Sequence, residues 1–237
     1  TLRGRSRCNA CKRTLTTIEL IPLVSFALQK ARCRSCGAVL LWQYPLVEGG
    51  TAVACGAATA ILIFFAQGGI TFSYLIVLGS LYTVIFSAIT IVVADIKFYI
   101  IPNGATLALA TAGVYATYYR MENAAGDPLL DFGIAAAASL FFGSLWFFSK
   151  GRWMGFGDVK LIFATSLLVG FPAAILALLF AFWVGAIGGL AFLAISRTSI
   201  KHSIIPFGPY ILIGALLAFF LSDWFLFYTG FSFFFGV

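Results

Sequence analysis

The sequence predicts an all-α polytopic membrane protein of about seven transmembrane helices, preceded by a small polar domain. Of its 237 residues, 62% are hydrophobic and only 10% are charged. Soluble domains are about half apolar and about a quarter charged, and a soluble fold of this size could not hide so much apolar surface. Apolar runs of about 18 residues or more recur along the chain, without the alternation of barrel strands. A soluble protein, a disordered protein and a transmembrane barrel are therefore excluded.

The first 45 residues differ in composition from the rest of the chain. They hold 8 of the 15 Lys and Arg residues and four of the five cysteines, and they contain no long apolar run. We therefore expect residues 1–45 to form a separate polar domain and residues 46–237 to form the membrane domain.

From Leu46 onward, apolar segments alternate with short polar breaks. One of these segments, 158–171, is short enough that it would be tilted or partly re-entrant. The spans are expected at about 46–66, 72–94, 101–119, 130–148, 158–171, 173–195 and 204–221.

The basic residues predict the orientation of these spans. With residues 1–45 in the cytoplasm, 14 of the 15 Lys and Arg residues fall on the cytoplasmic side, and Arg120 is the only one on the far side. This distribution obeys the positive-inside rule. The net charge of +7 thus reports orientation in a lipid bilayer, and no nucleic-acid partner is expected.

The N-terminal domain contains two CxxC pairs separated by 21 residues. Their spacing is typical of a zinc ribbon or knuckle, in which four thiolates close a tetrahedron and leave no open position for catalysis. Disulfides and inert thiols are the alternatives, but disulfides rarely persist in the cytoplasm. Cys55 lies within the first span and is expected to be a small buried apolar residue. The predicted ligands of a structural Zn²⁺ are Cys8, Cys11, Cys33 and Cys36.

Two aspartates at the cytoplasmic ends of spans are the strongest candidates for chemistry. Asp95 ends the span 72–94, and Asp158 opens the short span within Gly155-Phe-Gly157-Asp158. Two carboxylates at one depth can share a proton, so that one acts as a general base on water and the other as a general acid. The two glycines would allow a tight turn and the close approach of an extended peptide.

The competing interpretation is that each aspartate is a boundary acid paired with a nearby lysine. It accounts for Asp95 with Lys97 better than for Asp158, because Lys160 lies only two residues further on and does not face it on a helix. The single histidine, His202, excludes an HExxH metal site.

Other acids have simpler explanations. Glu48, at the start of the first span, is either an N-terminal helix acid favoured by the dipole or a ligand. Glu19 is expected to be an acid on the surface of the polar domain. Asp131 and Asp223 are expected to be boundary acids.

Taken in order, these motifs resemble the type IV prepilin peptidases, GxGD-type aspartyl proteases of peptidase family A24. The resemblance covers most of the chain. It is carried by the two CxxC pairs, Glu19-Leu-Ile-Pro-Leu-Val-Ser25, Arg32-Cys-Arg-Ser-Cys-Gly37 leading to Tyr44-Pro-Leu-Val-Glu48, Gly155-Phe-Gly-Asp-Val-Lys-Leu161 and Ile205-Pro-Phe-Gly-Pro-Tyr210.

The resemblance implies a bacterial inner-membrane enzyme that removes the basic leader of prepilins or pseudopilins, after a glycine and on the cytoplasmic side. Its catalytic aspartates match Asp95 and Asp158 here. Members with the cysteine domain usually also methylate the new N-terminus with S-adenosylmethionine. The region of Glu19 and Glu48 is a weak candidate for that second reaction. Family members usually carry one further membrane helix before the cysteine domain, which implies eight spans in such a protein and seven in this sequence.

Two hypotheses of other classes remain open at this point. A transporter or channel would place acids near mid-membrane, on discontinuous helices in two related halves. A non-catalytic scaffold of a secretion system would not require either aspartate. The leading hypothesis is a membrane aspartyl peptidase that acts on prepilin-like substrates.

Overall fold

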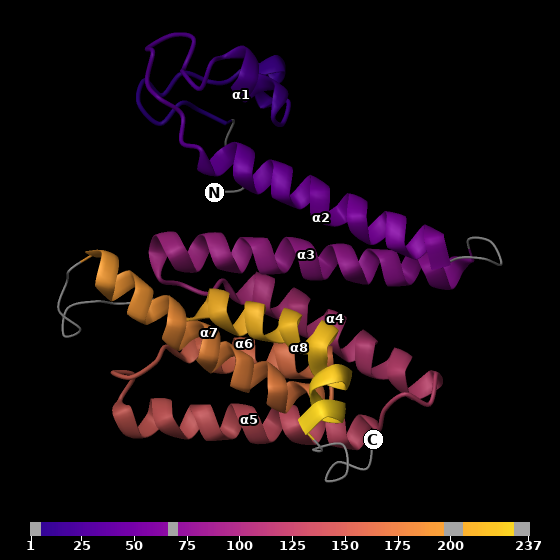
Figure 1. Cartoon of the computed structure of the whole chain (residues 1–237). Helices are drawn as coiled ribbons and strands as arrows, with labels where there is room; N and C mark the ends of the chain where they lie inside the picture. The colour runs from indigo at the N-terminus through magenta and orange to yellow at the C-terminus, as the bar shows by residue number, and fades with distance from the viewer. Residues whose placement is uncertain (1–5, 66–70, 197–205, 230–237) are drawn as a thin grey trace. The chain divides into compact units, whose positions relative to one another are not determined.

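The computed structural model describes residues 6–65, 71–196 and 206–229; from residue 43 onward the described residues are mostly helical, whereas residues 6–42 are mostly turns and loops (Figure 1). The described residues also contain two isolated antiparallel β-bridges, Arg7 with Thr14 and Arg32 with Val39. The chain divides into two compact units, Thr1–Leu78 and Gly79–Val237. His202 and the start of the last expected span lie outside the described residues.

The first unit contains the cysteine-rich segment and the first long helix. The segment has a short 3-10 helix η1 (Thr17–Leu20) and a single-turn helix α1 (Val24–Leu28), and the long helix is α2 (Gln43–Phe65). Helix α3 (Phe72–Phe98) begins in this unit and continues into the second.

The second unit is a helical bundle. After α3 it contains α4 (Asn103–Glu122), α5 (Pro128–Ser149), α6 (Phe156–Val169), α7 (Ala173–Ser196) and α8 (Gly208–Thr229). The starts of two helices follow from local sequence. The Asp127 side chain accepts the N–H of Leu129 at 2.8 Å and Pro128 occupies the first turn of α5, whereas Gly155 is the N-cap of α6.

The helices confirm the prediction of a polytopic helical membrane protein. The six helices α2 to α7 lie within about four residues of the expected spans, whereas α8 runs to Thr229, eight residues beyond the expected end of the last span at 221. Five of them, α2, α3, α5, α7 and α8, are long and apolar enough to cross a bilayer. Helix α4 and the 14-residue α6 do not meet that standard, so the count of seven spans stays a prediction.

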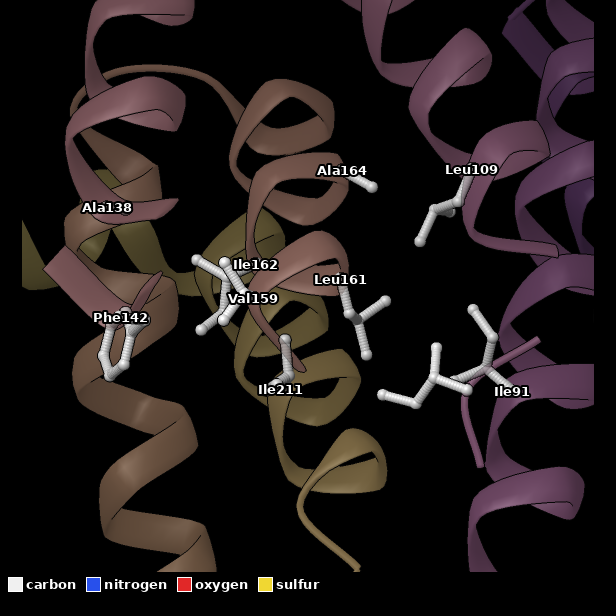
Figure 2. Packing of buried hydrophobic residues seen from close by; sticks show 10 residues of the cluster. Ile91, Leu109, Ala138, Phe142, Val159, Leu161, Ile162, Ala164 and Ile211 are labelled. Atoms are coloured by element: carbon white, nitrogen blue, oxygen red, sulfur yellow. The ribbon is translucent and has the colours of Figure 1, made fainter. Parts of the chain in front are cut away.

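Helix α6 occupies the centre of the second unit and packs against α4, α5, α7 and α8. Its side chains are buried on several faces, and Leu161, Ile162 and Ala164 have no exposed surface. Figure 2 shows these residues meeting Leu109 of α4 and Ile211 of α8 in one apolar core. A helix enclosed in this way explains why a segment shorter than its neighbours remains helical: packing, not length, stabilises it.

Two acids differ from their expected environments. Glu19 is not a surface acid, because it is 6% exposed and its carboxylate binds Arg13 and the N–H and hydroxyl of Thr16. These contacts, led by the Thr16 N–H, lower the pKa of Glu19. Asp131 is not a plain boundary acid either, since it is 1% exposed and forms an ion pair with Arg120. Both errors arise because sequence position alone does not reveal a buried partner.

Candidate active site

The two candidate aspartates line the same cavity, which has a volume of about 370 Å³. The cavity lies within the second unit, where the end of α3, the connection to α4 and the start of α6 come together. Its lining residues are Asp95, Tyr99, Ile100, Ile101, Asn103, Gly155, Phe156, Gly157, Asp158 and Lys160.

Asp95 lies in the last turn of α3 and is 5% exposed. Its Oδ2 accepts the backbone N–H of Gly208 at 2.9 Å, and Gly208 is the first residue of α8. The positive end of a helix dipole therefore faces this carboxylate. A Cβ at position 208 would lie 2.7 Å from Oδ2 of Asp95, so any larger residue there would have to displace the carboxylate.

Asp158 lies in the first turn of α6 and is half-buried. Its Oδ2 accepts the N–H of the N-cap residue Gly155 at 3.1 Å, as the acid of a capping box does. Gly157 gives α6 a close approach to the connection after α3, since a Cβ there would lie only 3.0 Å from Cβ of Ile101. The glycines of the GxGD segment thus fix where Asp158 sits relative to that connection.

Both carboxylates are oriented by a hydrogen bond from a backbone N–H group. Each carboxylate uses Oδ2 for its backbone hydrogen bond. Within the described residues no hydrogen bond to Oδ1 of either aspartate is recorded, so both oxygens are available to water or substrate. Paired acids with one free oxygen each can activate a water molecule and protonate a leaving group.

The expected lysine partners do not bind these aspartates in the described part of the chain. Lys97 is exposed and does not line the cavity. Lys160 donates to Oδ1 of Asn103 and lies 5.4 Å from the ring centroid of Phe156. The boundary-acid interpretation therefore lacks the ion pairs that it needs.

Sequence reasoning missed two residues of this site. Gly208 was noted only within a motif near the last helix, and its N–H reaches Asp95 from 113 positions away. Asn103 is the first residue of α4, directly after the N-cap Pro102, and its side-chain hydrogen bond with Lys160 connects α4 to α6. The proximity of the Pro-Asn pair to Asp95 in sequence was the one available signal for Asn103.

We expect Gly208→Ala to lower the leader cleavage expected from the sequence about 100-fold, because the methyl group would displace the Asp95 carboxylate and small misplacements of reacting groups cost about that factor. The measurement is the initial rate of leader cleavage in detergent micelles. Gly104→Ala, at a position with no heavy atom within 4 Å of the added Cβ, is the matched control and should retain the wild-type rate. Equal rates for the two variants would show that the Gly208 contact is dispensable.

The four predicted metal ligands converge in the first unit. The sulfur atoms of Cys8, Cys11, Cys33 and Cys36 all lie within 4.8 Å of one another. The Sγ atoms of Cys8 and Cys36 are 3.9 Å apart, and four thiolates at about 2.3 Å from Zn²⁺ would be separated by about 3.8 Å. The donor set and its spacing fit a structural zinc ion.

The two CxxC turns repeat the same backbone arrangement. In each, the N–H of the first cysteine donates to the carbonyl five residues later, and its carbonyl accepts the N–H four residues later. Lys12 and Gly37 occupy equivalent positions with positive φ, at 59° and 68°. The backbone N–H groups of Cys36 and Ser35 lower the pKa of Cys33 to about 6, which favours the thiolate that a metal requires.

Glu48 has a structural partner. Its Oε2 accepts the N–H of Leu23 at 2.8 Å, where the backbone has a φ of 59° just before α1. The carboxylate therefore connects α2 to the cysteine-rich segment within the first unit, and neither sequence interpretation of Glu48 included this contact.

Comparisons with known proteins agree with the geometry. The bacterial peptidase A24 N-terminal domain matches residues 1–62, and the type IV leader peptidase family matches residues 82–190. A prepilin leader peptidase/N-methyltransferase of Bacillus subtilis is 33% identical over 219 residues, which cover 92% of this chain and 82% of that protein.

Proteins of the same name from Aeromonas salmonicida and Legionella pneumophila are 31% and 28% identical, over 92% of this chain and 72% and 73% of theirs. No solved structure matches the chain. The resemblance noted in the sequence is thus confirmed, and the chain belongs to the type IV leader peptidase family.

Proposed function

We propose that this protein is an aspartic peptidase that removes leader peptides from prepilins or pseudopilins, with Asp95 and Asp158 as its catalytic residues. The observation that carries the proposal is the shared cavity, which is lined by two acids 63 positions apart in the sequence. The relatives' names provide the substrate class. Such a pair has the composition needed to hydrolyse a peptide bond.

The geometry supports a two-acid mechanism. One aspartate removes a proton from a water molecule that attacks the scissile carbonyl, and the other donates a proton to the departing amine. The substrate must be unwound at this point, because a helix occupies its own carbonyls with hydrogen bonds. Gly155 lines the cavity without a side chain and favours the close approach of an extended backbone.

The second activity in the relatives' names is N-methylation. We propose that this chain also methylates the new N-terminus, with S-adenosylmethionine as the methyl donor. The carboxylates of Glu19 and Glu48 are already engaged within this chain: Glu19 pairs with Arg13, and Glu48 accepts the N–H of Leu23. These contacts suit structural roles and weaken the case for either residue as a methyl-transfer ligand.

We place the protein in the bacterial inner membrane, with residues 1–45 as a cytoplasmic zinc domain and 46–237 as the peptidase domain. The positive-inside distribution supports this orientation. The ion pair of Arg120 supports it further, because the single basic residue assigned to the far side is neutralised by the buried Asp131. Reduced cysteines are also expected in the cytoplasm.

The transporter alternative receives no support from the described residues. Its acids should lie near mid-membrane on interrupted helices. Asp95 instead lies in the last turn of α3 and Asp158 in the first turn of α6.

The proposed function can be tested by incubating the purified membrane protein with a synthetic prepilin and an isotope-labelled methyl donor. Mass spectrometry should show two products in order, a shortened chain and then the same chain with an added labelled methyl group. A shortened chain without label would contradict the methyltransferase activity alone. An intact substrate, with the protein folded and reconstituted in lipid, would contradict the peptidase assignment.

A further inference from the structure

The C-terminal end of α6 presents a problem that the rest of the bundle must solve. With 14 residues, α6 is roughly 21 Å long, whereas the hydrocarbon core of a bilayer is about 30 Å thick. The last four carbonyls of any helix lack donors within that helix. Lipid offers none, so a helix that ends inside the membrane requires donors from the protein.

Arg120 supplies two of these donors from α4. Its Nη1 donates to the carbonyl of Leu168 at 2.9 Å, and its Nη2 donates to the carbonyl of Leu167 at 2.8 Å. The N–H of Gly170 donates to the carbonyl of Ser166 at 2.9 Å. Three of the four terminal carbonyls of α6 are therefore satisfied, two of them by one guanidinium group. A cation at this end also complements the helix dipole.

Asp131 of α5 holds this guanidinium in place. Its Oδ2 accepts hydrogen bonds from Nε and Nη2 of Arg120 at 3.0 and 2.7 Å, and its Oδ1 accepts the N–H of Phe171 at 2.7 Å. The Asp131 side chain is 2% exposed. One ion pair thus connects α4, α5, the end of α6 and the segment that follows α6.

Two glycines leave space for the ion pair and for the close packing of α4 against α6. Gly170 has a φ of 75°, and a Cβ there would lie 2.7 Å from three atoms of the guanidinium. Gly113 of α4 brings the same two helices together, since its Cβ would lie 2.9 Å from Cβ of Leu167. Small residues permit such close packing between membrane helices.

The opposite end of α6 carries Asp158. A helix transmits an axial shift along its length, and apolar packing around α6 sets its register less specifically than directional hydrogen bonds do. We propose that Arg120, oriented by Asp131, is a positioning residue that fixes the depth of α6 and thereby the placement of Asp158 opposite Asp95. The inference rests on the proposed peptidase function only where it concerns catalysis.

Disulfide cross-linking tests the position of α6 without any enzyme assay. The added Cβ at Gly143 of α5 lies 3.6 Å from Cγ1 of Val159, the residue after Asp158. The pair Gly143→Cys/Val159→Cys should therefore cross-link under mild oxidation. The control pair, Gly185→Cys/Tyr210→Cys between α7 and α8, has a Cβ–Cβ distance of 3.7 Å, which suits a disulfide. Mass spectrometry of the linked peptides separates both products from the native cysteines.

We expect Arg120→Met to slow cross-linking of the first pair at least tenfold and to leave the control pair within twofold of its rate. In the enzyme with its native cysteines, the same substitution should lower kcat about 100-fold with KM within about threefold. Arg120→Lys retains the positive charge and one hydrogen-bond donor direction, so its kcat and cross-linking rate should each fall less than tenfold. If Arg120→Met fails to fold, Arg120→Lys replaces it in both assays.

The double variant Arg120→Met/Asp131→Leu distinguishes positioning from simple charge compensation. It removes both charges, so its thermal midpoint should recover relative to Arg120→Met, as apolar replacement of buried ion pairs often allows. Its kcat and cross-linking rate should stay low, because the Leu168 carbonyl still lacks its donor and the Leu167 carbonyl keeps only the Thr117 hydroxyl at 3.4 Å. Recovery of kcat in the double variant, or unchanged cross-linking in Arg120→Met, would overturn the inference. If the wild-type protein cleaves no prepilin, but Arg120→Met still slows cross-linking of the first cysteine pair, the proposed function is refuted and the positioning role stands.

Discussion

Asp95→Asn and Asp158→Asn should each lower the rate of leader cleavage about a thousandfold or more. Asparagine preserves the size of the side chain and its acceptor for the backbone N–H of Gly208 or Gly155, but it cannot exchange the proton that general acid–base catalysis needs. Because the two acids act as a unit, the double variant should be no slower than about the slower single variant. The measurement is single-turnover cleavage of a synthetic prepilin.

Asp223→Asn is the matched control for these variants. Asp223 lies in α8, is exposed and accepts a hydrogen bond from its neighbour Ser222, and it does not line the cavity. Its loss should leave cleavage at the wild-type rate. Retention of a tenth or more of the wild-type rate by either cavity variant would remove that aspartate from the proposed mechanism.

Loss of the metal from the cysteine cluster should unfold the N-terminal segment. Zinc contributes roughly 10–16 kcal/mol in small zinc domains at neutral pH, which is comparable to the entire stability of an average domain. The described segment has only a 3-10 helix and a one-turn helix before α2, so it has little other structure to stabilise it. Cys33→Ser, or a strong chelator, should therefore abolish zinc content and expose residues 6–42 to proteases.

Cys55→Ser provides the control for this experiment, because Cys55 lies within α2 and outside the cluster. Zinc content is measured by elemental mass spectrometry and protease sensitivity by peptide mapping. One zinc per chain in the wild type and in Cys55→Ser, with none in Cys33→Ser, is the expected result. A segment that keeps its protease resistance without metal would show that zinc is not what folds it.

Composition and the lengths of the apolar runs were sufficient for the helical segments. Each expected span from 46–66 to 173–195 overlaps one helix of the structure, because a lipid-exposed segment must satisfy its backbone hydrogen bonds internally and a helix does so. The CxxC spacing likewise identified the cysteine cluster, since two short turns place thiolates side by side with little help from the rest of the fold.

The sequence identified Asp95 and Asp158 because acids near membrane spans are rare and costly. The sequence did not reveal which residues form hydrogen bonds with the functional side chains. The hydrogen bond from Gly208 to Asp95 joins residues 113 positions apart, and the guanidinium of Arg120 reaches carbonyls 47 and 48 positions away. No local pattern encodes either contact.

The amino-acid sequence by itself determined the class of the protein, its helices, its cysteine cluster and its two candidate acids. These properties depend on hydropathy and on spacings of a few residues. Only the tertiary structure decided that both aspartates line one cavity and that Asp131 and Glu19 are buried in ion pairs. Those features depend on which helix faces meet, and packing between distant segments settles that question.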